Sequence, residues 1–128
     1  MLELRPTCEH CNKALPPESL EARICTYECT FCTTCVDNIL ANVCPNCGGG
    51  FVPRPIRPAT NWKGDNFLGK DPPSTKVKHR PVDPEAHALF AAAIKNIPPE
   101  KRSRPKVYNG EQRRLIGIGI FLAAYFSY

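Results

Sequence analysis

The placement of cysteine constrains this chain more than any other feature. All eight cysteines of the 128 residues lie between Cys8 and Cys47, in four pairs with two or three residues inside each pair. Two cysteines at this spacing can place both sulfurs on one metal ion across a tight turn, and structural zinc takes four such ligands in a tetrahedron. The spacing therefore predicts two closed metal sites and two Zn²⁺ per chain.

Two other interpretations of the cysteines are less favoured. Disulfides need an oxidising compartment, but the start Met-Leu-Glu-Leu-Arg-Pro has no apolar stretch of a secretory signal, so we expect a cytoplasmic protein. A redox Cys-x-x-Cys opens a helix in a larger α/β domain, for which four overlapping pairs leave no room. Because all the ligand positions are cysteine, no coordination position is open to substrate, and we expect no enzymatic activity.

The size of the cysteine-rich head also favours a metal-dependent fold. Residues 7–52 contain about a dozen sizeable apolar side chains besides the cysteines, too little apolar surface to offset the entropy of ordering that stretch. Structural zinc supplies folding free energy directly in small domains. We therefore expect the head to fold only with metal bound.

The order of the cysteines narrows their pairing without deciding it. The sites are cross-braced if the first and third pairs share one metal and the second and fourth pairs share the other. Site 1 is then Cys8, Cys11, Cys32 and Cys35, and site 2 is Cys25, Cys29, Cys44 and Cys47. A sequential arrangement, with the first two pairs on one metal and the last two on the other, remains open.

The same spacing resembles that of RING-type domains. The first loop, the short middle gap and the final Cys44-Pro45-Asn46-Cys47 have counterparts there, and the short central helix of such domains would correspond to residues 36–43. The resemblance implies a small, metal-stabilised α+β domain, either a RING-like cross-brace or a treble clef. In this chain a proline-rich linker and an α-helical tail would follow it.

The resemblance does not extend to the residues that ubiquitin ligases use. RING-type ligases carry an apolar residue inside the first pair, an aromatic residue before the last pair and a basic residue after the final cysteine. This sequence has His10, the polar Thr33-Thr34 and Gly48 at those places, and only Pro45 fits. Ligase-like activity is therefore not expected, and His10 is expected to be a solvated turn residue rather than a ninth ligand.

Several short motifs of the head resemble a small bacterial family. They are Cys-Glu-His-Cys, Leu-Pro-Pro-Glu-Ser, Ala-Arg-Ile-Cys, Glu-Cys-Thr-Phe-Cys and Val-Cys-Pro-Asn-Cys-Gly-Gly-Gly. The head is similar to the domain of unknown function DUF1272 over residues 1–58, and the stretch 61–67 resembles an extension of its longer members. The resemblance implies the fold and zinc binding, and it implies no activity.

Charge divides the chain into an acidic head and a basic remainder. Residues 1–52 carry three basic and six acidic side chains, whereas residues 53–128 carry fourteen basic and six acidic ones. Nucleic-acid affinity depends on cations that displace counterions, so such binding would come from the tail and is not favoured. We predict a two-zinc cysteine-rich domain (1–52), a proline-rich extended linker (53–82), an amphipathic helix (83–97), a basic flexible segment (98–114) and an apolar C-terminal segment (115–128).

The linker is expected to be extended and irregular. Alternating prolines in residues 51–58 fix φ near polyproline values and predict a spacer or a strap. Residues 59–80 have few large apolar side chains, and we expect this stretch to lie over the head with Trp62 and Phe67 as anchors.

One helix is well signalled in the tail. Asp83 suits the N-cap, Pro84 the first helical position, and prolines 98–99 end the helix, so we predict it over about residues 84–96. Its apolar stripe is Ala86, Leu89, Phe90, Ala93, Ile94 and Ile97. Docking on the head and self-association through Leu89, Phe90, Ile94 and Ile97 both remain open. His87 lies beside the stripe and is expected to be solvated.

The last fourteen residues, 115–128, contain no charged side chain. As a helix they would be about 21 Å long, which is short of the hydrocarbon core of a bilayer at about 30 Å. A full membrane span is therefore not expected. Weak association with a membrane interface, packing on the protein and self-association remain open.

Taken together, these patterns predict a zinc-binding protein that acts as a structural or protein-interaction module. Two alternatives belong to other classes. One is a thiol-based sensor of oxidants or metal, in which labile thiolates respond to their surroundings. The other is nucleic-acid binding through the basic tail.

Overall fold

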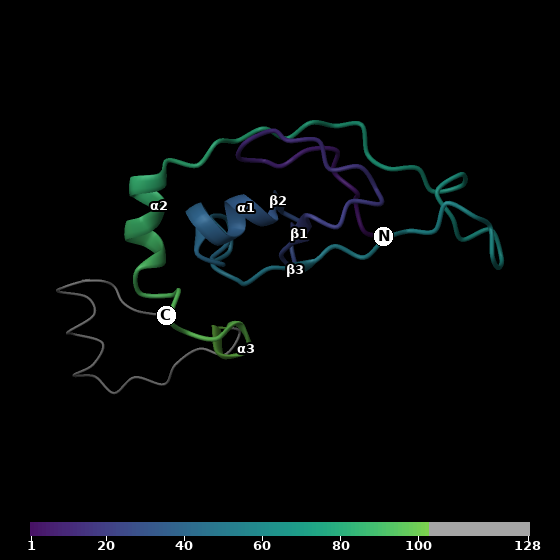
Figure 1. Cartoon of the computed structure of the whole chain (residues 1–128). Coiled ribbons are helices and arrows are strands. Elements are labelled where there is room, and N and C mark those ends of the chain that lie inside the picture. Colours follow the sequence, from purple (N-terminus) through teal and green to yellow (C-terminus); the bar gives the residue numbers. More distant parts are fainter. Residues whose placement is uncertain (103–128) are drawn as a thin grey trace.

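The computed structural model describes residues 1–102. It shows a small domain with a three-stranded sheet and a few short helices, followed by a long irregular segment and a helical tail (Figure 1). The elements in chain order are β1 (Ala22–Ile24), β2 (Thr30–Cys32), α1 (Thr33–Cys35), the π-helix η1 (Val36–Leu40), β3 (Val52–Pro53), α2 (Pro84–Ala91) and α3 (Pro99–Arg102).

The sheet has the order β2-β1-β3, and both pairings are antiparallel. In the β1–β2 hairpin Ala22 is opposite Cys32, and Ile24 is opposite Thr30. Glu28 closes the turn with a left-handed φ of 65° and donates its amide to the carbonyl of Cys25 at 3.0 Å. The hairpin therefore places one cysteine pair at its turn and begins the next pair at the end of β2.

A short helix follows β2 directly, as the sequence predicts, but with different ends. It begins at Thr33 and ends at Leu40, whereas residues 36–43 were expected. Ala41 and Asn42 adopt left-handed φ values of 53° and 57°, which end the helix before Val43. The left-handed region is costly for most side chains, so the closing turn has to be held by other contacts.

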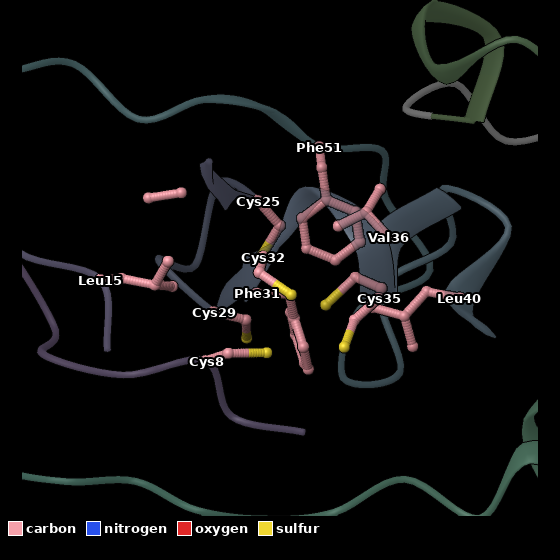
Figure 2. Packing of buried hydrophobic residues seen from close by; sticks show 12 residues of the cluster. Cys8, Leu15, Cys25, Cys29, Phe31, Cys32, Cys35, Val36, Leu40 and Phe51 are labelled. Carbon is pink, nitrogen blue, oxygen red and sulfur yellow. The ribbon is translucent and has the colours of Figure 1, made fainter. Parts of the chain in front are cut away.

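The core of the head consists mostly of cysteines and a few large apolar side chains. Figure 2 shows Phe31, Phe51, Val36 and Leu40 in one cluster with the cysteine sulfurs. Leu15 is also buried and belongs to the same cluster. The rings of Phe31 and Phe51 meet edge to face with centroids 5.5 Å apart. Because sulfur makes up so much of the cluster, the chemistry of the cysteines and the packing of the head are coupled.

The linker is a strap rather than a spacer. It runs away from the head, turns back and crosses the head again before α2 (Figure 1). The amide of Ser74 donates to the carbonyl of Leu4 at 3.0 Å, and the amide of Arg80 donates to the carbonyl of Glu9 at 2.7 Å. The strap is therefore tied to the N-terminal part of the head by main-chain hydrogen bonds.

The prediction that Trp62 and Phe67 anchor the strap on the head is wrong. The side chain of Trp62 is 79% exposed, and the ring of Phe67 packs locally against Gly69. The guanidinium of Arg57 instead donates to the carbonyls of Leu2 and Asp71, each at 2.8 Å. Arginine can satisfy several carbonyls at once, which a single aromatic ring on an irregular segment cannot do.

The tail helix is shorter than expected, and a different face of it is buried. Asp83 caps α2 by accepting the amide of Glu85 at 3.1 Å, but the helix ends at Ala91 and continues as turns. His87, expected to be solvated, is 4% exposed, and Ala91 is also buried. Leu89, expected in the packed stripe, is 81% exposed. Apolar spacing alone missed this face because a histidine with a carbonyl partner can be buried.

The predictions for residues 103–114 and for the apolar segment 115–128 lie outside the described residues. Within residues 1–102, no helix combines the length and the apolar character that a membrane crossing requires.

Candidate metal centre

The first group of cysteines contains all four residues expected for site 1. The sulfurs of Cys8, Cys11, Cys32 and Cys35 all lie within 4.8 Å of one another, and only Cys11 is exposed among them. The sulfurs of Cys11 and Cys32 are 3.8 Å apart. A tetrahedron with metal–sulfur bonds of about 2.3 Å separates its sulfurs by about 3.8 Å, so this donor set fits zinc in both chemistry and size.

The second group contains three of the residues expected for site 2, with the fourth beside them. The sulfurs of Cys25, Cys44 and Cys47 lie within 4.8 Å of one another, and Cys47 is exposed. Cys29 falls outside this set of mutually close sulfurs, yet its thiol is hydrogen-bonded with those of Cys44 and Cys25. The group could hold a metal ion with three sulfurs as it stands, and with four if the sulfur of Cys29 joins them.

The length of β2 explains why neighbouring pairs in the sequence do not meet. Cys29 comes just before β2 and Cys32 ends it. A strand rises about 3.3 Å per residue, so the two residues are about 10 Å apart along the chain. The second and third pairs are therefore held at opposite ends of one strand, and each is joined by a pair from elsewhere in the sequence.

The first and last pairs lie on two turns with the same hydrogen bonding. The amides of Asn12 and Gly48 donate to the carbonyls of Cys8 and Cys44 at 2.9 Å and 2.8 Å. Asn12 and Gly48 both have left-handed φ values, 64° and 76°. Asparagine and glycine are the residues that tolerate this conformation best, so their position directly after each pair is required by the turn.

Main-chain amides point at several of the sulfurs. The amide of Tyr27 donates to the sulfur of Cys25 at 3.3 Å, and the amide of Asn46 donates to the sulfur of Cys44 at 3.4 Å. The amide of Gly49 donates to the sulfur of Cys47 at 3.4 Å. Such hydrogen bonds favour the thiolate, which is the form that binds metal.

Burial has the opposite effect on the thiols. Burial raises the pKa of Cys25 to about 11, and it also raises the pKa of Cys8 and Cys35. The hydrogen bond between Cys44 and Cys29 raises the pKa of Cys44 and lowers the pKa of Cys29 to about 6. Crowded, buried thiols cannot all ionise by themselves. A bound dication would supply the compensating charge, so the electrostatics of both groups also fit a metal.

Sequence reasoning missed a buried carboxylate inside the first turn. Glu9 is 2% exposed. Its Oε2 accepts from Arg5 Nη1 and from the amide of Thr30, both at 2.7 Å, and its Oε1 accepts from Arg80 Nη2 at 3.2 Å. A buried charge has to be paired, and an arginine four residues before this glutamate was a signal that could have identified the pair.

A second missed residue is Arg54, which sequence reasoning assigned to the linker. It is 4% exposed and donates to the carbonyls of Arg5, Leu15 and Pro16 at 2.9–3.0 Å. Burial lowers the pKa of its guanidinium. This side chain fastens the chain after β3 to two loops of the head, and only the tertiary structure reveals its partners.

His10 is half-buried rather than solvated. Its Nδ1 accepts from the amide of Val82 at 2.9 Å, and its carbonyl accepts from His79 Nε2 at 3.1 Å. The described cysteine groups do not include it. His10 therefore fastens the strap to the first turn.

The comparisons with known proteins agree with the cysteine pattern. The model of the family described as protein of unknown function (DUF1272) matches residues 1–57. An uncharacterized protein of Rhizobium meliloti (strain 1021) is 57% identical over 63 residues, which are 49% of this chain and 75% of that relative. No solved structure matches the chain. The chain belongs to the DUF1272 family.

Proposed function

We propose that the protein binds two Zn²⁺ in a RING-like cross-brace and acts as a structural module for protein interaction in the cytoplasm. The observation that carries the proposal is the all-sulfur composition of two separate groups, one at each end of β2. Soft thiolate ligands select zinc over magnesium or calcium. Thiols at this density stay reduced in a reducing compartment, which supports the cytoplasmic location.

The ligand sets support a structural role for the metals: the first group brings four sulfurs together, and we propose Cys29 as the fourth ligand beside the three sulfurs of the second group. Four sulfurs fill a tetrahedron and leave no position for a substrate or a reactive water. Each group joins residues from two distant parts of the chain, so metal binding would stabilise the tertiary fold directly. The role of the metals is then to hold a surface in shape.

The surface of the head offers apolar side chains to a partner protein. A recess of about 290 Å³ beside β3 is lined by Leu2, Ile24, Cys25, Thr26, Glu28, Gly50 and Val52. A second recess of about 230 Å³ shares Leu2 and is lined also by Met1, Leu4, Pro55, Ile56 and Arg57. Apolar recesses with a polar rim are typical of protein-binding surfaces, and these two support the interaction role.

The test combines metal analysis with partner capture. The purified full chain is expected to hold two zinc ions, and the zinc-loaded chain is expected to retain a protein from a lysate of its own host. Val52→Lys and Ile56→Lys are expected to abolish that capture, and Leu89→Lys serves as the matched control because Leu89 is also exposed but lies on α2. Capture that disappears with nuclease and high salt would instead favour the nucleic-acid alternative. Capture that Val52→Lys and Ile56→Lys leave unchanged would contradict the interaction surface.

The sensor alternative has one observation in its favour. Cys11 and Cys47 are exposed, so each group has a ligand that an oxidant can reach. In that case substoichiometric peroxide should release zinc reversibly, with recovery after a thiol reductant is added. A structural module should keep both metals under the same treatment.

A further inference from the structure

The tail covers the turn that carries the last cysteine pair. Gly48, directly after Cys47, lies against the tail: a Cβ placed there would be 3.7 Å from Phe90 Cζ and from Ile94 Cδ1. A Cβ at Gly50 would be 2.7 Å from Pro99 Cγ, so no larger residue fits there without movement of the tail. The glycine run of residues 48–50 therefore accommodates the docked tail as well as the turn.

Arg102 joins the two ends of this turn. Its Nη1 donates to the carbonyl of Asn42 at 2.7 Å and to the carbonyl of Gly48 at 3.3 Å. Asn42 lies two residues before Cys44, and Gly48 lies one residue after Cys47. One guanidinium thus bridges the segment that contains both cysteines.

Two further contacts hold the parts in place. Nε of Arg102 donates to the carbonyl of Ile97 at 2.8 Å, which fixes the side chain on its own segment. The Nε2 of His87 donates to the carbonyl of Leu40 at 2.9 Å, which holds α2 against η1 on the other side of the turn. The tail therefore contacts the chain on both sides of the turn: η1 before it and the glycines after it.

We propose that residues 84–102 form a clamp on the second metal centre, so that docking of the tail and occupancy of that centre stabilise each other. The inference rests on the proposed zinc binding. The carbonyls that Arg102 binds belong to the turn whose shape two metal-bound cysteines would fix. If metal holds the turn in the shape that the tail recognises, the docked tail must by reciprocity raise the affinity of that turn for the metal. Because differences in affinity between related complexes arise mostly in the dissociation rate, we expect the gain to appear as slower release of the metal.

The charges of Arg102 and of the second metal centre support the clamp. Among the described residues, the hydrogen bonds of Arg102 go to carbonyl oxygens, so no carboxylate neutralises its positive charge through these bonds. Four thiolates around Zn²⁺ leave a formal charge of about −2, and the ion's charge has to enter any local electrostatic argument. A cation fastened to the carbonyl of the residue next to Cys47 would compensate the charge of such a centre.

The experiment follows zinc release from the full, zinc-loaded chain into an excess of a chromogenic chelator. Arg102→Gln is expected to speed the release of one zinc about tenfold and to leave the other unchanged, within the usual range of coupling between two sites. Arg102→Lys should recover part of the effect. The matched control is Arg57→Gln, because Arg57 also binds two carbonyls but lies on the strap.

Two additional measurements assign the effect. Trapping of freed cysteines with an alkylating agent should label Cys44 and Cys47 first in Arg102→Gln. Hydrogen exchange over residues 84–102 should accelerate in Cys47→Ser and stay unchanged in Cys11→Ser, which removes the exposed ligand of the other group.

The outcomes separate the clamp from the zinc proposal. A parent chain without zinc would overturn both. A parent with two zinc ions, together with an Arg102→Gln protein that releases both at the parental rates, would overturn the clamp alone. If Arg102→Gln released both zinc ions faster to the same extent, the clamp would also be overturned, because the effect would then be a general loss of stability.

Discussion

The Nε2 of His87 lies 2.9 Å from the carbonyl oxygen of Leu40, the last residue of η1. This contact joins the tail to the helix that follows the third cysteine pair. The carbonyl at a helix end has no partner within its own helix. Here it accepts from the amide of Val43 at 3.0 Å and from the histidine, which comes from a distant segment. The tail is thus docked on the head by a polar contact in a buried place.

Replacement of His87 tests this contact. His87→Ala would remove one of the two hydrogen bonds that the Leu40 carbonyl accepts, since the amide of Val43 remains its other donor at 3.0 Å. We expect a cost of about 0.5–1.5 kcal/mol in unfolding free energy. We expect faster amide exchange over residues 84–91 and no loss of zinc from the first group. Leu89→Ala is the control, because Leu89 is exposed and an exposed substitution changes stability by less than about 0.5 kcal/mol. Equal exchange in the two variants would show that the contact does not hold the helix.

The buried carboxylate of Glu9 provides a second prediction. Glu9→Gln would remove the buried charge partner of Arg5 and leave it Glu3, whose Oε1 accepts from Arg5 Nε at 3.1 Å. We expect a loss of about 1–3 kcal/mol in urea unfolding of the zinc-loaded chain, less than for a charge left fully unpaired. Glu18→Gln is the matched control, since Glu18 is exposed on the same head. A loss no larger than that of the control would mean that solvent reaches the Arg5–Glu9 pair.

Arg54 gives a third prediction, based on geometry rather than charge. Arg54→Lys keeps the positive charge but replaces a planar fork by a single ammonium group, which cannot reach the carbonyls of Arg5, Leu15 and Pro16 together. We expect a loss of about 1–3 kcal/mol in unfolding free energy. Arg23→Lys, on β1, serves as control. Parental stability of Arg54→Lys would show that charge alone accounts for the role of this residue.

The sequence allowed prediction of the features that depend on local chemistry. Cysteine spacing predicted that the sulfurs would gather in two groups that could hold metal, because two-residue turns and the ligand preference of zinc are local properties. It left open which pairs would meet, because that depends on the course of the chain between them. Asp83 and Pro84 predicted the start of α2 for the same reason. The existence of a short helix after the third pair also followed from the spacing, although its ends did not.

The partners of charged and polar side chains could not be predicted in this way. Arg54, Arg102 and His87 bind carbonyls that are 38 to 60 residues away in the sequence. Any exposed carbonyl is an equally good acceptor, so residue type does not select the partner. The face of α2 that is buried depends on such a contact, and for this reason the apolar stripe was a poor guide to it.

Gly48 gives a fourth prediction. Its φ of 76° is left-handed, and its counterpart Asn12 has 64°. Both Gly48→Asn and Gly48→Val place a side chain against Phe90 and Ile94 of the tail. Gly48→Val should lose about 1–2 kcal/mol more than Gly48→Asn, because asparagine tolerates the left-handed backbone and valine does not. Thermal unfolding of the two zinc-loaded variants measures the difference. Similar melting of both variants would mean that the second turn can change its conformation.

The pairing of cysteines gives the last prediction. Because β2 separates Cys29 from Cys32 by about 10 Å, the second and third pairs should not share one metal. In protein loaded with cadmium-113, through-bond correlation should link one metal to the protons of Cys8 and Cys32, and the other to those of Cys25 and Cys44.

The exposed Cys11 and Cys47 allow a second check of the pairing, because Cys11→Ser should disturb only the first cadmium signal and Cys47→Ser only the second. A metal correlated with both Cys8 and Cys25 would establish the sequential arrangement. In that arrangement the turn that carries Cys8 and Cys11 would have to move from the end of β2, where it now meets Cys32, to the opposite end, where Cys25 and Cys29 lie.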